Sequence, residues 1–199
     1  IMNIDIAPSK IDIGKLAAEW AIEKGSFDSI TEFLNSKLSG FKTGDNQSLE
    51  PRDVVLYGFG RIGRLAAREL IKQAGKGQQL RLRAIVVRNN SEDQIKKRAS
   101  LLRMDSVHGP FPGTIFEDYE NKNLIINGQV INIIQANHPS EIDYTAFGIN
   151  NALVLDNTGV FTDKEALSNH LKSKGVSKVI LTAPGKEIPN IVYGINQKE

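Results

Sequence analysis

The chain has 199 residues, a formal net charge of +2 at pH 7 and 40% hydrophobic residues, which is an ordinary globular composition. Its length is typical of one domain, or of one domain with an appendage. The basic residues are scattered, without the basic stripe of nucleic-acid-binding domains, and no apolar run approaches the roughly 18 residues of a membrane span. We therefore expect neither nucleic acid nor a membrane among its partners.

Cysteine is absent, and the three histidines, His108, His138 and His170, lie far apart in the sequence. Without cysteine this chain can form no disulfide and offers no thiolate for catalysis or metal binding. The histidines show no metal-ligand spacing. The N-terminus, which does not begin with Met, has no basic-then-apolar signal segment. We expect a cytoplasmic protein without a metal site.

Residues 1–50 are predicted to form a helical extension that ends in a polar, linker-like segment. Ser9 can cap a first helix that carries an apolar stripe, and Ser29 with Glu32 fits the capping box of a second helix. We favour packing of the stripe on the domain that follows, because apolar stripes are usually core. A partner contact through Trp20 is the alternative.

The most informative stretch begins at residues 53–57, a short β-branched apolar run that leads directly into Gly58-Phe59-Gly60-Arg61-Ile62-Gly63. Helical spacing starts there, and strand, glycine turn and helix start in this order are the fingerprint of dinucleotide binding. Gly58 allows the tight turn, Gly60 lets a pyrophosphate approach the backbone, and Gly63 lets the helix pack against the strand. The helix N-terminus then directs free N–H groups at the phosphates. A glycine-rich turn without a ligand is the alternative.

The rest of the chain predicts an α/β fold, a Rossmann-type doubly wound, mostly parallel sheet with an antiparallel hairpin insertion. The run at 82–87 is almost continuously apolar, as expected for a strand that is covered on both faces. Asn127-Gly128 between two apolar runs predicts a hairpin with a type I′ turn. Further strands are expected at 152–155, 178–181 and 191–193.

Two further helices are predicted from their capping residues. Ser91 with Gln94 fits the start of one helix, and Thr162 with Glu165 fits the start of the other. The second of these helices is expected to end at Gly175.

Five blocks, in one order, closely resemble the cofactor domain of phosphorylating glyceraldehyde-3-phosphate dehydrogenase. They are Y-G-F-G-R-I-G-R at 57–64, D-S-V-H-G-P-F at 105–111, D-N-T-G-V-F at 156–161, V-I-L-T-A-P-G-K at 179–186 and V-Y-G-I-N at 192–196. The likeness covers residues 53–199 and is far more specific than the glycine motif alone. Residues 1–50 have no counterpart in the common short form of the family and resemble the extension of a longer bacterial variety. The domain boundary is therefore expected between residues 50 and 51.

The resemblance implies a glycolytic oxidoreductase that oxidises and phosphorylates glyceraldehyde 3-phosphate to 1,3-bisphosphoglycerate with NAD or NADP. In the family a cysteine thiolate attacks the aldehyde, a hydride passes to the nicotinamide, and inorganic phosphate releases an acyl phosphate. That cysteine lies in S-C-T-T-N, shortly after the block matched here by Gly194-Ile195-Asn196, and this chain stops at Glu199. We expect the polypeptide to be the cofactor half of the enzyme, without a catalytic residue of its own and inactive alone.

Two other readings stay open. Erythrose 4-phosphate could be the substrate, because substrate selection in the family lies in the half that is absent here. The chain could also be a non-catalytic dinucleotide-binding module with residues 1–50 as a partner arm. A reading frame that continues past Glu199 into S-C-T-T-N would favour the enzyme, which in the family is a homo-oligomer, a tetramer.

The resemblance assigns cofactor contacts to three places. They are Phe59, Gly60, Arg61 and Ile62 for the pyrophosphate, Thr158 and Gly159 for a pair that lines the cofactor, and Thr182 beside the nicotinamide ribose. The last two places end predicted parallel strands, where open α/β sheets bind ligands, although a strand-end turn needs no ligand. Residues 105–109 are expected to form a structural turn, with His108 as a hydrogen-bonded member. At 136–139 the family has E-R-D-P near the adenine, so an arginine is missing there.

The end of the second strand departs from the NAD-selective pattern. An acidic residue is expected there to bind the ribose hydroxyls, but the sequence reads Val87-Arg88-Asn89-Asn90, and the first acid is Glu92. An arginine can bind a 2′-phosphate, whereas a carboxylate repels it. We therefore predict that NADP is tolerated or even preferred. In the alternative, Arg88 is a solvated surface residue and Asn89 or Asn90 holds the ribose.

Overall fold

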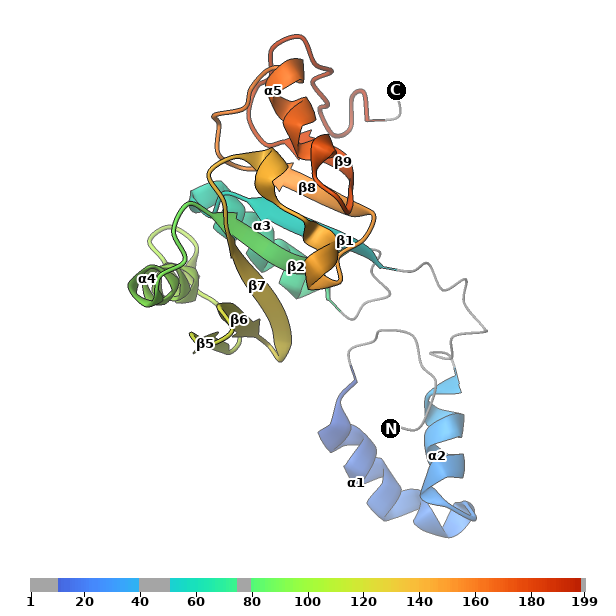
Figure 1. Cartoon of the computed structure of the whole chain (residues 1–199). Helices are drawn as coiled ribbons and strands as arrows, with labels where there is room; N and C mark the ends of the chain where they lie inside the picture. The colour runs from blue at the N-terminus through green and yellow to red at the C-terminus, as the bar shows by residue number, and fades with distance from the viewer. Residues whose placement is uncertain (1–10, 40–50, 75–79, 198–199) are drawn as a thin grey trace. The chain divides into compact units, whose positions relative to one another are not determined.

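The computed structural model describes residues 11–39, 51–74 and 80–197 (Figure 1). They fall into two compact units. The helical unit holds the described residues before Arg52 together with Gln73 and Ala74, and the α/β unit holds the others. Within these three ranges, no helix combines the length and the hydropathy needed to cross a membrane.

The helical unit has a small core of its own. It consists of α1 (Ile13–Glu23), the 3₁₀ turn η1 (Lys24–Ser26) and α2 (Ile30–Lys37). Its buried side chains belong to Phe33, Leu34 and Leu38, and those packed against them belong to Ile11, Leu16, Trp20 and Phe27. Part of the predicted apolar stripe is therefore covered by α2.

The two helices of this unit begin differently from one another. Ser29 Oγ accepts a hydrogen bond from Glu32 N at 3.1 Å, which confirms Ser29 as the cap of α2. Glu32 Oε2 accepts from Asp28 N at 2.9 Å, so the predicted capping box is only half formed. At the start of α1, Asp12 Oδ1 accepts from Lys15 N at 2.9 Å. The predicted cap Ser9 lies outside the described residues.

The α/β unit is built on one seven-stranded sheet with the order β5-β6-β7-β2-β1-β8-β9. The strands are β1 (Arg52–Tyr57), β2 (Leu80–Val87), β5 (Ile115–Asp118), β6 (Asn123–Ile126), β7 (Gln129–Gln135), β8 (Ala152–Asp156) and β9 (Val176–Leu181). Strands β7, β2, β1, β8 and β9 are parallel to one another, and β5 and β6 extend the sheet beyond β7 as antiparallel strands. The predicted fold class is thus confirmed. From β1 the chain adds β2 and then β7 on one side of the sheet, and afterwards returns to add β8 and β9 on the other side of β1. The direction of winding therefore reverses between β1 and β8.

Both faces of the sheet are covered at β1, whose residues therefore alternate between two cores. Val54 and Leu56 pack with apolar residues of α3 and α4, whereas Val55 and Tyr57 pack with residues of the segment between β7 and β8. In Figure 1, α3 runs behind β1 and β2. The helices of this unit are α3 (Arg61–Gln73), α4 (Glu92–Arg103) and α5 (Lys164–Ser168), with the 3₁₀ turns η3 (Pro139–Glu141), η4 (Tyr144–Phe147) and η5 (Asn169–Lys172).

The predicted hairpin is confirmed and forms part of the main sheet. Asn127 and Gly128 have φ angles of 50° and 80°, as a type I′ turn requires, and they join β6 to β7. Because β7 is also the parallel neighbour of β2, the hairpin widens the sheet instead of standing apart from it.

Two local expectations are wrong, and a third, the cap of α4, holds only in its position. Ser91 stands at the N-cap of α4, but its side chain makes no capping hydrogen bond. The cap of α5 is Asp163, whose Oδ1 accepts from Ala166 N at 2.8 Å, instead of Thr162, and the helix passes into η5 well before Gly175. Residues 191–193 form no strand, because they lie exposed in a turn-rich segment without a paired neighbour among the described residues.

The turn at 105–109 is held by the Asp105 side chain, as expected. Its Oδ1 accepts hydrogen bonds from His108 N at 2.9 Å and Val107 N at 3.0 Å, and lies 3.0 Å from His108 Nδ1. These bonds, those from His108 first, hold the pKa of the carboxyl below its usual range. A small ribbon of β3 (Met104–Asp105) and β4 (Gly109–Pro110) frames this turn.

The strand-to-helix turn after β1 depends on the absence of a side chain at Gly63. A Cβ at this position would lie 2.4 Å from the carbonyl oxygen of Gly58, which itself has a φ of 90°. The helix therefore approaches the strand as closely as the fingerprint predicted.

We expect Gly63→Ala to destabilise the chain by about 1–3 kcal/mol, because the added methyl group overpacks this contact. Gly60→Ala is the matched control, since a Cβ there meets nothing within 4 Å. Urea unfolding measures both variants, and equal midpoints would contradict the prediction.

Candidate functional site

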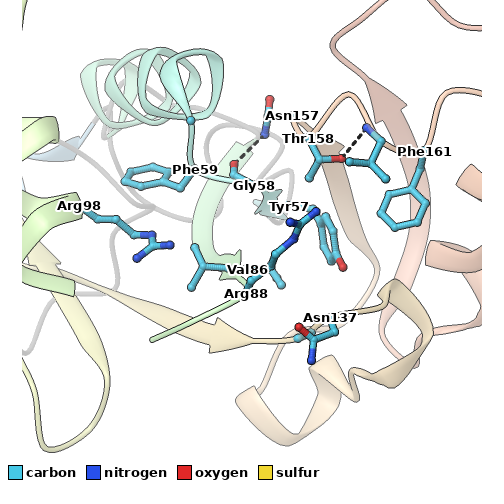
Figure 2. Close-up of a pocket in the computed structure, with 14 residues that line it drawn as sticks. Tyr57, Gly58, Phe59, Val86, Arg88, Arg98, Asn137, Asn157, Thr158 and Phe161 are labelled. Atoms are coloured by element: carbon cyan, nitrogen blue, oxygen red, sulfur yellow. Dashed lines mark hydrogen bonds between the residues drawn. The ribbon is translucent and has the colours of Figure 1, made fainter. Parts of the chain in front are cut away.

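A cleft of about 410 Å³ opens where β1, β2, β7 and β8 end (Figure 2). It is lined by Tyr57, Gly58, Phe59, Gly60, Val86, Val87, Arg88, Arg98, Ala136, Asn137, Asn157, Thr158, Val160 and Phe161. The cleft lies at the carboxyl ends of the strands and at the reversal of the winding, which is where open α/β sheets bind ligands.

The predicted cofactor residues divide into two groups. Those that line the cleft are Gly58, Phe59, Gly60, Arg88 and Thr158. Those that do not line it are Arg61, Ile62, Gly63, Asn89, Gly159 and Thr182. Three of the second group, Arg61, Ile62 and Gly63, form the first turn of α3, which follows the cleft-lining Gly60 directly in the chain.

The start of α3 leaves backbone donors available at the cleft. The first helical bond of this turn runs from Arg64 N to Gly60 O at 3.0 Å. The N–H groups of Arg61, Ile62 and Gly63 precede it and have no carbonyl within the helix to bind. Since nothing occupies the space where Gly60 would carry a Cβ, an anion can approach this turn closely.

The two asparagines after β2 are engaged elsewhere. Asn89 Oδ1 accepts from Ser91 N at 2.8 Å, and Asn90 Nδ2 donates to Ile133 O at 3.1 Å. Their side chains therefore stabilise the turn and the neighbouring strand β7. The exposed Arg88 is the residue of this segment that lines the cleft.

Sequence reasoning missed Arg98, which α4 contributes to the cleft wall. The available signal was its helical position three residues after Ile95 and next to Ala99, both of which are buried against the sheet. Its Nη1 donates to Gln94 O at 3.0 Å and to Gln94 Oε1 at 3.1 Å, so the guanidinium is held in place.

Tyr57 places a phenol in the cleft wall. Burial raises its pKa to about 12, assisted by the negative charges of Asp156 and Glu141 and opposed by Arg88. The hydroxyl is therefore protonated at neutral pH and can act as a donor. The ring makes edge contacts with Phe161 and His170, at centroid distances of 6.0 Å and 4.6 Å.

A buried carboxylate, Asp156 at the end of β8, organises the two threonines. Its Oδ1 accepts from Thr158 N at 2.8 Å and Thr158 Oγ1 at 2.7 Å, while its backbone oxygen accepts from Thr182 N and Thr182 Oγ1, both at 3.0 Å. Asn157 Oδ1 also lies 3.1 Å from Thr182 Oγ1. Thr158 and Thr182 are thus held by one residue, although only Thr158 reaches the cleft.

His170 completes this network from η5. Its Nε2 lies 2.9 Å from Asp156 Oδ2, and both side chains are 0% exposed. Its Nδ1 has no hydrogen-bond partner among the described residues. The tautomer with the proton on Nε2 fits best, because it donates to the carboxylate and buries no second N–H. In the described part of the chain, no group of three His, Asp or Glu side chains could hold a metal ion.

We expect Asp156→Asn to destabilise the chain by about 1–3 kcal/mol, because an amide cannot accept from both Thr158 and His170 and one buried donor loses its partner. Asp163→Asn is the control, since asparagine caps a helix as well as aspartate does. Urea unfolding compares them, and equal midpoints for the two variants would argue against the network.

Comparison with known protein families also points to a dinucleotide-binding domain. Residues 52–164, more than half of the chain, match the family described as glyceraldehyde 3-phosphate dehydrogenase, NAD binding domain. This range covers β1 to the start of α5 and therefore contains every residue that lines the cleft.

Several relatives bear the corresponding name. A glyceraldehyde-3-phosphate dehydrogenase-like protein of Pseudomonas aeruginosa (strain UCBPP-PA14) is 52% identical over 201 residues, which cover 99% of this chain and 43% of that protein. The glyceraldehyde-3-phosphate dehydrogenases of Zymomonas mobilis and Aspergillus oryzae are 34% and 38% identical over 73% of this chain, and over 41% and 40% of their own lengths. The chain thus spans less than half the length of these relatives. It belongs to the glyceraldehyde-3-phosphate dehydrogenase family, of which it carries the NAD-binding domain.

Proposed function

We propose that the cleft binds NAD or NADP with the pyrophosphate on the first turn of α3. The observation that carries this proposal is the open backbone at Gly60, next to helix N–H groups that have no internal partner. The adenosine half then lies toward the end of β2, and the nicotinamide half lies toward Thr158 at the end of β8. The cofactor, when bound, supplies a hydride acceptor.

The chain's own residues bind and orient this cofactor. Thr158 is held by Asp156, so its hydroxyl oxygen stays at a fixed place in the cleft wall. The Tyr57 hydroxyl remains protonated at neutral pH and can donate to a polar group of the ligand. Gly159 follows β8 and Thr182 follows β9, and we propose that they support this half of the site.

For the whole protein, we propose the oxidation and phosphorylation of glyceraldehyde 3-phosphate to 1,3-bisphosphoglycerate, in a cytoplasmic homo-oligomer. The names of the relatives support this reaction, and the sequence of this chain contains no cysteine for the thiol step. The attacking thiolate would therefore come from a further domain. In this division of labour, residues 1–50 are a separate extension and residues 51–199 are the cofactor domain.

The binding site is tested by calorimetric titration of the chain with NAD. Gly60→Ala is expected to weaken binding by roughly tenfold or more, because the methyl group displaces a charged ligand from at least one backbone donor. The same variant should keep its unfolding midpoint, as its Cβ meets no protein atom within 4 Å. Unchanged NAD affinity in Gly60→Ala would refute the assignment.

Tolerance of NADP is proposed from Arg88, which takes the place of the acidic residue at the end of β2. Titration with NADP should give an affinity at least comparable to that for NAD. An affinity for NAD that exceeds that for NADP by about tenfold or more would contradict this.

The purified 199-residue chain is expected to show no oxidation of glyceraldehyde 3-phosphate in a spectrophotometric assay of cofactor reduction, because it has no thiol nucleophile. Titration of the same sample with NAD serves as the control for a folded cofactor site. Measurable, phosphate-dependent reduction by the chain alone would overturn the proposed division of labour.

A further inference from the structure

We propose that Arg98 of α4 anchors a phosphate group on the ribose 2′-position of the cofactor, with Arg88 as its second contact, so that this site selects 2′-phosphorylated dinucleotides. The inference rests on the proposed function, because it presupposes a dinucleotide in the cleft. It adds a second residue and a preference to the tolerance inferred from Arg88 alone.

The first observation is the placement of Arg98. Figure 2 shows its side chain beside Phe59, with the guanidinium pointing into the cleft. Gln94, one turn earlier on α4, holds Nη1 through two hydrogen bonds, at 3.0 Å and 3.1 Å. A guanidinium has five N–H donors, so the edge away from Gln94 remains available for a ligand.

The second observation concerns charge. Among the described residues, neither Arg88 nor Arg98 forms an ion pair with a carboxylate. Arg98 is partly buried, and this burial alone lowers its pKa. A half-buried cation without a carboxylate is unfavourable, and an anionic ligand in the cleft would supply the missing counter-charge.

The acidic groups near the cleft are already used. Glu141 Oε2 accepts from Asn137 N and His138 N, each at 3.2 Å, and the Asp156 carboxylate binds Thr158 and His170. At the end of β2, where NAD-selective folds place an acid, the chain has asparagines. No acidic residue of the described ranges lines the cleft, and the first acids after β2 are Glu92 and Asp93 in the first turn of α4.

Arg88, which also lines the cleft, can contribute a second positive charge to a bound phosphate. It is exposed, it follows β2 directly, and its charge is felt at Tyr57, where it opposes the rise in pKa. A phosphate monoester carries a charge of about −1.5 to −2 at pH 7, which two guanidinium groups match. The hydroxyl of an unphosphorylated ribose would leave most of this positive charge unpaired.

The test uses two isomers of one charge, adenosine 2′,5′-bisphosphate and adenosine 3′,5′-bisphosphate, titrated into the 199-residue chain. We expect the 2′-isomer to bind about tenfold tighter or more, as a charge-assisted contact to phosphate requires. Arg98→Gln should remove most of this difference, with Arg88 retaining the remainder, while the affinity for NAD changes less than about twofold. Lys97→Gln removes an exposed cation from the adjacent position of α4 and should leave both values unchanged.

The outcomes separate this inference from the proposed function. If NAD binds but the two isomers bind equally, the 2′-phosphate subsite is refuted and the cofactor site stands. If Arg98→Gln weakens NAD and the 2′-isomer by the same factor, Arg98 contacts a part that both ligands share, which also overturns the inference. Failure of the unmodified chain to bind either NAD or NADP would instead refute the proposed function.

A conservative variant covers a loss of folding in Arg98→Gln. Arg98→Lys keeps the positive charge but not the planar fork, so the preference for the 2′-isomer should fall without disappearing. Unfolding midpoints in urea identify the variants that are folded. Full retention of the preference in a folded Arg98→Gln would contradict the role of Arg98, whatever Arg98→Lys shows.

Discussion

The backbone N–H and carbonyl of Gly58 make the contacts that connect the central strands of the α/β unit to its first helix. Its N–H donates to Val86 O of β2 at 3.0 Å, and its carbonyl lies where Gly63 of α3 would carry a side chain. The same carbonyl is 3.5 Å from the side-chain amide of Asn157, just after β8. One residue in a left-handed conformation therefore joins two parallel strands, the first helix and the loop that follows β8. The walls of the cleft are fixed by the same contacts that connect strand to helix.

The buried polar residues of the α/β unit are Asp53, Asp105, Asp156, His170 and Ser173, and of these Asp156 and His170 are 0% exposed. The Asp156 carboxylate satisfies Thr158 on one side and His170 on the other, and the His170 ring packs edge-on against Tyr57. Buried charges persist in proteins when they are hydrogen-bonded on all sides, as this one is. The polar groups at the Thr158 end of the cleft are thus held in place by contacts within the protein.

The features that were predictable from the sequence are those with a local cause. Asn127-Gly128 carries its own turn geometry, and the glycines after β1 carry theirs, so the hairpin and the fingerprint needed no knowledge of distant residues. Thr162 and Asp163 are both good caps one position apart, and only the final packing of α5 selects the second. Residues 191–193 have strand-like composition, but a strand also requires a paired neighbour.

The site itself was only half predictable for the same reason. The residues that follow strands, Gly58, Gly60, Arg88 and Thr158, could be placed because parallel strands end at a common edge. Arg98 lies on a helix whose rotation about its axis is set by the burial of Ile95, and the pairing of Asp156 with His170 joins separate elements. These contacts depend on tertiary packing, which sequence periodicity describes only coarsely.

β9 is an edge strand of the described sheet, and this position affects how copies of the chain can associate. Its outer row of amide and carbonyl groups has no neighbouring strand among the described residues, and Ile180 is 45% exposed there. An unpaired edge strand of this kind is a template with which a strand of another copy can pair. Strand pairing at β9, or at β5 on the opposite edge of the described sheet, would let copies of this polypeptide associate through backbone hydrogen bonds at high concentration.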